Sequence, residues 1–304
     1  MAGELTKLQK LFVDYYLDTE NEIKAAILAG YSYKKASLCG KKNLENPRVS
    51  REIEVRREER ATRKNAVAET ASVTKLTDVI APAFYTVHWD IIEGKHTYYD
   101  LFGGRGSTKS SFIGTEIVLG IMSDPLANAI IYRKVGNTIG NSVYEQILWS
   151  IEALGVRHLW IARTSPHSFT YLPTGQVIKF RGLDKAKKTK SIKIAKGYFK
   201  FLWFEELDEF SGEEEIRSVQ QSVLRGGTKF VVFKSFNPPI SKSNWANQYV
   251  LTPRKDALRH KSCYLDVPTE WLGQQFLDDA DFLKETNPRA YEHEYLGEAI
   301  GTGG

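Results

Sequence analysis

A cluster of three glycines followed by Lys-Ser constrains this chain more than any other feature. It occupies residues 103–110, between an aromatic and apolar run at residues 98–102 and an apolar helical pattern at residues 112–121. A strand, a glycine-rich loop, Lys-Ser and a helix, in that order, are the layout of a phosphate-binding loop. Backbone N–H groups and a helix N-terminus cradle the phosphates, the lysine reaches the β and γ oxygens, and a hydroxyl binds Mg²⁺. The sequence therefore predicts a nucleotide site here.

One position departs from the usual phosphate-binding pattern. Thr108 stands where the pattern has glycine, directly before Lys109 and Ser110. A helical φ at this position tolerates threonine, whereas a positive φ strains a β-branched side chain. The φ angle of residue 108 therefore decides whether threonine fits the motif. Evidence for a nucleotide site must also come from the rest of the chain.

Bulk properties limit the class of protein. The chain has 304 residues, 42% of them hydrophobic and 26% charged, which predicts one large or two ordinary folded domains. The net charge of +5 tolerates a polyanionic partner without proving one. No apolar run approaches the roughly 20 residues of a membrane span and no signal peptide is evident, so we expect a soluble intracellular protein without a membrane partner. Two distant cysteines, Cys39 and Cys263, predict reduced thiols.

The first sixty residues predict helices only. Helical spacing covers residues 5–17, 22–28 and 32–44, and Gly30 separates the last two helices. Two short helices joined by a glycine-containing turn fit a helix-turn-helix. The third helix carries four lysines that would reach DNA: Lys34, Lys35, Lys41 and Lys42. The alternative is a small three-helix module with a solvated basic face.

From about Ser72 the pattern changes to strands alternating with helices. This alternation predicts an α/β domain whose parallel sheet has helices on its faces. The expected strands are residues 97–102, 127–133, 201–204 and 229–234, with a hairpin formed by residues 168–171 and 176–180.

Two acidic residues follow the buried-strand pattern at residues 201–204. Glu205 and Glu206 come directly after its last apolar residue. At the carboxyl end of a parallel strand, one acid can hold Mg²⁺ and the other can orient and deprotonate an attacking water. Glutamate is abundant in the residues that follow, so a chance placement is the alternative. Their position after a glycine loop favours the catalytic interpretation.

Three further segments each keep two interpretations. Ser235 and Asn237 follow the strand at residues 229–234, where they can contact the γ-phosphate or form an ordinary strand-ending turn. The lysine-rich residues 185–200 are a solvated loop or a DNA-facing or nucleotide-sensing one. The aromatic pair within residues 82–88 stacks on adenine or serves as core or lid.

The N-terminal segment resembles a known family. Residues 5–13 (LTKLQKLFV), 25–32 (AAILAGYS) and 46–49 (NPRV) are similar to the DNA-binding domain of phage terminase small subunits. The resemblance implies recognition of viral DNA by the helix of residues 33–44. The charged residues 51–64 lack an apolar stripe and depart from that family, so they predict a linker helix or a solvated face.

From about Thr74 to Gly304 the chain resembles the ATPase domain of phage terminase large subunits. Five blocks carry the resemblance in the family's order: residues 103–110, 181–184 with the lysine run, 203–210, 235–239 and 291–298. It implies a P-loop ATPase fold with a mostly parallel sheet flanked by helices at residues 71–304. A small all-α helix-turn-helix domain precedes it at residues 1–70.

The resemblance also implies roles for individual residues. The expected nucleotide-binding residues are Gly103, Gly104, Gly106, Ser107, Thr108, Lys109 and Ser110. Glu205 is the metal-side acid, with Ser110 as second Mg²⁺ ligand, and Glu206 is the catalytic acid. Ser235 and Asn237 belong to a motif that couples hydrolysis to movement. Arg105 is a candidate phosphate or transition-state contact, in its own or a neighbouring subunit; weaker candidates are Arg133, Arg217 and Arg225.

The implied function is an ATPase motor of phage DNA packaging, which uses ATP and Mg²⁺ to move double-stranded viral DNA into a procapsid. It implies a homo-oligomeric ring docked on a portal protein in the host cytoplasm, from a phage or a prophage, with a terminase small subunit or a separate nuclease chain as further partners. The family's nuclease domain is not among residues 1–304, so we expect no DNA cleavage by this chain. The alternatives are a non-catalytic DNA-recognition fragment and another DNA translocase or helicase of the same ATPase superclass.

Overall fold

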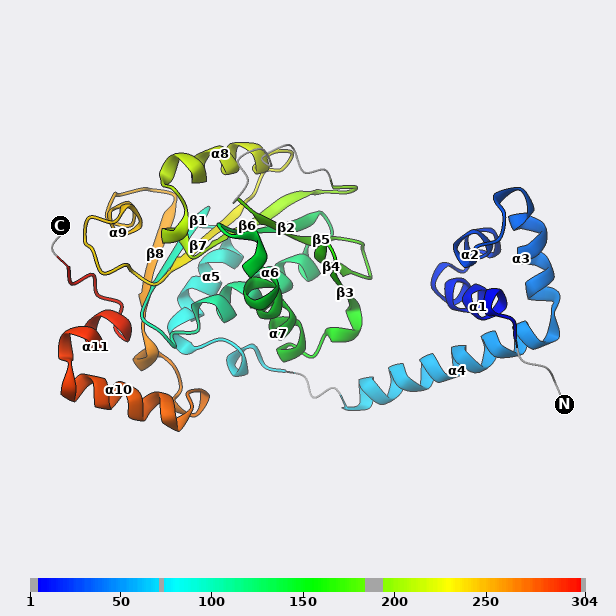
Figure 1. Ribbon diagram of the computed structural model, residues 1–304, viewed down its shortest axis with the longest axis horizontal. Helices are drawn as coiled ribbons and strands as arrows, with labels where there is room; N and C mark the ends of the chain where they lie inside the picture. The colour runs from blue at the N-terminus through cyan, green and yellow to red at the C-terminus, as the bar shows by residue number, and fades with distance from the viewer. Residues whose placement is uncertain (1–4, 71–73, 184–193, 302–304) are drawn as a thin grey trace. The chain divides into compact units, whose positions relative to one another are not determined.

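The chain folds into two compact units, residues 1–72 and 73–304 (Figure 1). The computed structural model describes residues 5–70, 74–183 and 194–301, and within residues 59–70 it describes the backbone alone. In this part of the chain, no helix is both long and apolar enough to cross a membrane.

The first unit contains helices and no strand in its described residues. Their bounds are α1 Lys7–Thr19, α2 Glu22–Ala29, α3 Ala36–Glu45 and α4 Pro47–Thr70, with a 3-10 turn at Tyr33–Lys35 before α3. The side chain of Asn21 accepts a hydrogen bond from the N–H of Lys24 and so caps α2, which ends at Gly30 with a φ of 100°. Phe12, Val13 and Val49 form part of a core between these helices.

Two boundaries in this unit differ from the expectation. Ser32 makes no side-chain cap, and a single 3-10 turn precedes α3, so the α-helix begins four residues later. The charged helix is longer than expected and runs from Pro47, since proline is well suited to the first turn of a helix.

An eight-stranded sheet organises the second unit, in the order β3-β4-β5-β2-β6-β7-β1-β8. The strands are β1 Tyr98–Gly103, β2 Ala127–Arg133, β3 Trp160–Thr164, β4 His167–Tyr171, β5 Val177–Gly182, β6 Tyr198–Glu205, β7 Val231–Phe236 and β8 Ala257–Ser262. All pairs from β5 to β8 are parallel, whereas β3, β4 and β5 pair in antiparallel fashion at one edge.

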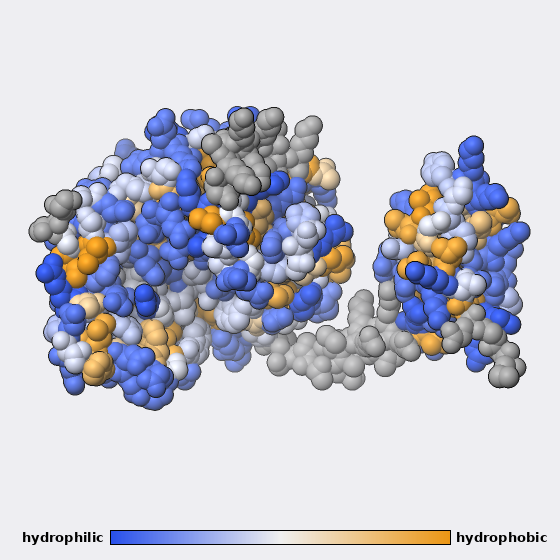
Figure 2. Space-filling view, in the orientation of Figure 1, coloured by the Kyte–Doolittle hydropathy of each residue, from blue (hydrophilic) through white to orange (hydrophobic). Residues whose placement is uncertain are grey.

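Helices cover both faces of the sheet (Figure 1). The helices of this unit are α5 Tyr85–Glu93, α6 Lys109–Ser123, α7 Glu145–Ala153, α8 Glu213–Val223, α9 Trp245–Tyr249, α10 Gln274–Thr286 and α11 Pro288–Glu294. Residues of α10 and α11 form a separate small core with Tyr264. The α6 face holds a core that includes Phe112, Ile117 and Trp203, and the α8 face holds one with Leu202 and Val219. Hydrophobic residues on the visible surface of this unit form small separate groups (Figure 2).

The expected strands in the middle of the sheet are present, and two edge strands were missed. β1, β2, β6, β7 and the hairpin of β4 and β5 lie within a few residues of their predicted bounds. β3 and β8 were not expected, and residues 85–93 form helix α5. The prediction of an α/β fold with a mostly parallel sheet and a preceding helical module is confirmed.

Strand order brings the candidate residues together. β6, β7 and β1 are consecutive neighbours, and all run parallel. The glycine loop follows β1, Glu205 and Glu206 lie at the end of β6, and Ser235 and Asn237 lie at the end of β7. The carboxyl ends of parallel strands meet at one edge, where ligands bind in open α/β sheets.

Candidate nucleotide site

A cavity of about 240 Å³ lies at this edge of the sheet. Its lining combines the loop and the first turn of α6 with residues from the ends of β6 and β7: residues 104–111, Glu205, Glu206, Ser235, Phe236 and Asn237. Of the expected nucleotide-binding residues, only Gly103 is not part of the lining, and its carbonyl contacts the lysine of the loop.

Two glycines of the loop are required by close packing. A Cβ on Gly104 would lie 1.7 Å from the carbonyl oxygen of Tyr295. Gly106 has a φ of 73°, and a Cβ there would lie 2.6 Å from the ring of Phe276. Phe276 is on α10 and Tyr295 follows α11, so the C-terminal helices pack directly on the loop.

Thr108 adopts the strained conformation. Its φ is 63° and its ψ is 18°, which is the left-handed region, and it stands at the N-cap position of α6. Its Oγ1 is buried and has no hydrogen-bond partner among the described residues. Left-handed non-glycine residues are uncommon and concentrate at functional sites.

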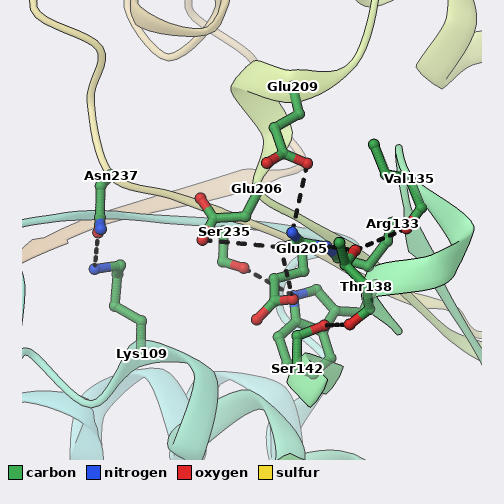
Figure 3. Close-up of polar contacts among 11 residues, drawn as sticks. Lys109, Arg133, Val135, Thr138, Ser142, Glu205, Glu206, Glu209, Ser235 and Asn237 are labelled. Atoms are coloured by element: carbon green, nitrogen blue, oxygen red, sulfur yellow. Dashed lines mark hydrogen bonds and ion pairs between the residues drawn. The ribbon is translucent and has the colours of Figure 1, made fainter. Parts of the chain in front are cut away.

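Lys109 is held by oxygens of the loop and of β7's terminal segment. Its Nζ donates to the carbonyl of Gly104 at 3.1 Å and to Oγ of Ser107 at 3.0 Å. It also donates to Oδ1 of Asn237 at 2.9 Å (Figure 3). Burial lowers the pKa of Lys109 to about 8, and the nearby Glu206 carboxylate partly opposes this shift. An ammonium so placed can exchange these neutral acceptors for phosphate oxygens.

Arg133 links the acidic residues at the end of β6. Its Nη1 lies 3.1 Å from Oε2 of Glu205 and 3.9 Å from Oε1 of Glu206, and its Nη2 lies 3.5 Å from Oε2 of Glu209 (Figure 3). Nε donates to Oγ1 of Thr138 at 3.4 Å. Arg133 therefore holds the two candidate acids from the end of the neighbouring strand β2.

Burial tunes both acids toward the neutral form. It raises the pKa of Glu205 to about 7, although the positive charge of Arg133 acts in the opposite direction. Burial also raises the pKa of Glu206, and Asp208 adds to that shift. Glu206 is itself left-handed, with a φ of 54°. Two acids with raised pKa values in one cleft are typical of a functional site.

Ser235 and Asn237 contact the site in different ways. Ser235 pairs with Glu205 in the register of β6 and β7, and its Oγ accepts a hydrogen bond from Nε1 of Trp203 at 2.8 Å. Asn237 instead reaches Lys109, which its sequence position alone did not predict.

The chemistry of the lining fits Mg²⁺. Ser110 and Glu205 line the same cavity and offer a hydroxyl and a carboxylate, which are oxygen ligands of the kind this ion prefers. No cluster of three or more His, Cys, Asp or Glu capable of holding a metal occurs among the described residues. Mg²⁺ in nucleotide sites needs only one or two protein ligands, since phosphates and waters supply the others.

The arginine candidates occupy different places. The side chain of Arg105 is 66% exposed and lies 3.9 Å from the Glu294 carboxylate. Arg217 on α8 and Arg225 after it are exposed and do not line the cavity. Arg133, considered a weaker candidate from the sequence, contacts both acids. The sequence signal that pointed to Arg133 was its position at the end of the expected strand at residues 127–133.

Three remaining candidates are not among the residues that line this cavity. The expected DNA-binding lysines of the first unit, at positions 34, 35, 41 and 42, are all exposed. Phe84 is fully buried and stacks on Phe112 at 4.7 Å, so it belongs to the core. The lysine run falls largely in residues 184–193, outside the described residues, and Lys200 pairs with Asp124 at 2.9 Å.

The fold and the cavity define an α/β domain with a phosphate-binding-loop motif at the carboxyl edge of a mostly parallel sheet. Residues 95–298 match the family model of the phage terminase large subunit, and residues 5–88 match that of the terminase small subunit. The chain belongs to the phage terminase large subunit family. It is 40% identical over 236 residues to the protein described as "Terminase, large subunit" of Bacillus phage SPP1, covering 75% of this chain and 55% of that protein.

Other relatives agree with this family. The PBSX phage terminase large subunit of Bacillus subtilis (strain 168) is 27% identical over 227 residues, covering 68% of this chain and 49% of the relative. The solved large terminase of a thermophilic bacteriophage superposes with a TM-score of 0.56 at 12% identity, covering 72% of this chain and 53% of that structure. At this identity, the similarity to the solved structure shows the fold alone. The chain spans about half the length of the curated relatives it matches.

Proposed function

We propose that this chain is the ATPase motor of phage DNA packaging, which hydrolyses ATP to move double-stranded viral DNA into a procapsid. The observation that carries the proposal is the convergence of Lys109, the two acids and Asn237 on one cavity. Structures of the thermophilic bacteriophage's large terminase in complex with ADP and with ATP-γ-S support a nucleotide as the ligand of this fold.

Each residue has a distinct task in this proposal. The loop's N–H groups, with Lys109, bind the β- and γ-phosphates. Ser110 and Glu205 hold Mg²⁺, which offsets the phosphate charge. Glu206 orients the attacking water and accepts its proton. Asn237 loses its hydrogen bond from Lys109 when that lysine turns to the phosphate, and so couples nucleotide binding to the end of β7. Arg133 is a positioning residue that keeps both acids at the cavity.

The partners follow from the same proposal. The first unit would bind viral DNA, and ATP-driven movement would require a homo-oligomeric ring docked on a portal protein in the host cytoplasm. A terminase small subunit or a nuclease chain would complete the machine. The strained Thr108 favours one rival function, a non-catalytic DNA-recognition fragment.

DNA-stimulated ATP turnover separates the two functions. We expect Lys109→Ala and Glu206→Gln each to lower kcat by roughly 10²–10⁴-fold, the usual effect of losing a general base or an equally placed catalytic group. Glu214→Gln is the matched control, because Glu214 is an exposed acid of α8 that does not line the cavity. Equal turnover by the wild type and the two site variants would falsify the motor function.

A further inference from the structure

A second cavity lies on the α8 face of the sheet, where apolar and cationic side chains line it together. It has a volume of about 140 Å³ and shares no lining residue with the nucleotide site. Three cationic side chains reach it from different elements: Arg217 of α8, Lys234 of β7 and Arg254 after α9. Among the described residues that line this cavity, Glu213 is the one acid.

Lys234 is the buried cation of this cavity. It is 1% exposed, and its Nζ donates to Oη of Tyr249 at 2.6 Å and lies 3.4 Å from Oδ1 of Asp100. Arg259 shares the same carboxylate, with its Nε 3.4 Å from Oδ2. One fully buried carboxylate therefore balances two cations, and burial lowers the pKa of Lys234.

Two further donors are available at this cavity. Nε2 of Gln220 is buried without a hydrogen-bond partner among the described residues. The hydroxyl of Tyr249 accepts from Lys234, so its own proton is free to be donated. Arg254 is oriented by Asp256, with Nε 2.6 Å from Oδ1, and by the ring of Tyr98 below its guanidinium. Buried donors normally have acceptors, and here a ligand would supply one.

We propose that this cavity binds a phosphate-sized tetrahedral oxyanion, held by Arg217, Gln220 and Lys234. The three cations and the free donors converge on a space smaller than the nucleotide cavity, which excludes a whole nucleotide. An oxyanion accepts several hydrogen bonds at once and neutralises the cationic excess.

The position of the site gives an occupant access to the catalytic segments. Leu207, the residue after Glu206, lines the cavity, and Lys234 directly precedes Ser235. Two sources of the same chemistry exist under the proposed function: inorganic phosphate released by hydrolysis, and a backbone phosphate of DNA. Only this assignment of the source rests on the proposed function, because phosphate binding itself requires no turnover.

Isothermal titration of the full chain with inorganic phosphate tests the site. Every protein carries Lys109→Ala, so that the phosphate-binding loop contributes little, and NaCl holds the ionic strength constant. We expect phosphate to bind saturably at one site. Its affinity should be about tenfold weaker in Arg217→Ala, because that variant loses one charge-assisted hydrogen bond. Gln220→Glu, which places a carboxylate in the cavity, should abolish binding. Arg225→Ala is the matched control, because this exposed arginine follows α8 outside the cavity lining.

The outcomes are distinct. Thermal melting first establishes that each variant is folded. Equal phosphate affinity in Arg217→Ala, Gln220→Glu and the control overturns the proposal, as does the absence of binding in the parent protein. Where binding depends on Gln220, a short DNA duplex that competes with phosphate assigns the backbone as the ligand. A duplex that leaves phosphate binding unchanged assigns the free ion. A chain that binds phosphate here yet does not hydrolyse ATP would overturn the motor function alone.

Discussion

At the scale of single residues, Thr108 carries a cost that glycine would not. A left-handed threonine is disfavoured by about 1–2 kcal/mol, and its buried, unpartnered Oγ1 adds to the cost of folding. Against this, glycine lowers the free energy of unfolding by roughly 0.5–1 kcal/mol, because it makes the unfolded chain more flexible. We therefore expect Thr108→Gly to raise the free energy of unfolding by about 1 kcal/mol, measured by urea denaturation.

The control for this substitution is Thr228→Gly. Thr228 is exposed and has an ordinary negative φ, so its replacement should leave stability unchanged or lower it. A loss of stability in Thr108→Gly as large as in the control would contradict the strain argument. Nucleotide affinity of the same variant shows whether the strained angle serves binding, because strain at functional sites often does.

The pKa values of two residues predict the pH dependence of turnover. Glu205, with a pKa raised to about 7, is protonated below that pH and would then be a poor ligand for the Mg²⁺ of the proposed function. Lys109, with a pKa lowered to about 8, loses its charge above that pH and attracts phosphate less. We expect kcat/KM for ATP to rise through about pH 7 and to fall above about pH 8, since this parameter reports the free enzyme.

Arg133 sets the acid limb of that profile. Its charge lowers the pKa of Glu205 against the effect of burial, so Arg133→Gln should move the acid limb to higher pH. Lys134→Gln is the matched control, because the neighbouring Lys134 pairs with Glu215, 2.7 Å away, and leaves Glu205 untouched. An acid limb at the same pH in both variants would rule out Arg133 as the residue that tunes the site.

At the scale of elements, the sequence was most informative where strands are buried on both faces. β1, β2 and β6 are mostly apolar and aromatic and end in glycine, arginine and glutamate, and β7 carries Ser235 directly before its last residue. Both the strands and the candidate residues at their ends were therefore predictable. β8 reads Ala-Leu-Arg-His-Lys-Ser and is only half-buried, because it forms an edge of the sheet. Because β8 is largely polar, the apolar pattern that predicts a strand was absent from its sequence.

Contacts between distant elements could not be predicted in the same way. The glycine at position 104 fits a phosphate-binding pattern, yet in this structure it is also required by the approach of Tyr295, 191 residues later in the chain. The link between Lys109 and Asn237 likewise depends on the order of β1 and β7 in the sheet. Sequence patterns predicted the members of the candidate site, and strand order determines which of them are in contact.

At the scale of the whole molecule, the chain joins a helical unit with exposed lysines to a unit that carries the proposed nucleotide site. The two units have separate hydrophobic cores, so changes to surface lysines of the first should leave ATP binding by the second intact. This separation allows DNA binding and nucleotide chemistry to be tested independently in the full chain.

DNA affinity of the full chain should depend steeply on salt if the first unit contacts phosphates. Each phosphate contact contributes a slope of about −0.9 to the dependence of log K on log salt concentration. Replacing the four lysines at positions 34, 35, 41 and 42 with alanine should flatten the slope by up to about 3.6 and weaken binding most at low salt. The control is Lys7→Ala with Lys24→Ala, two exposed lysines of the same unit outside α3 and its preceding turn. An unchanged slope in the fourfold variant would instead identify the first unit as a docking module for a protein partner.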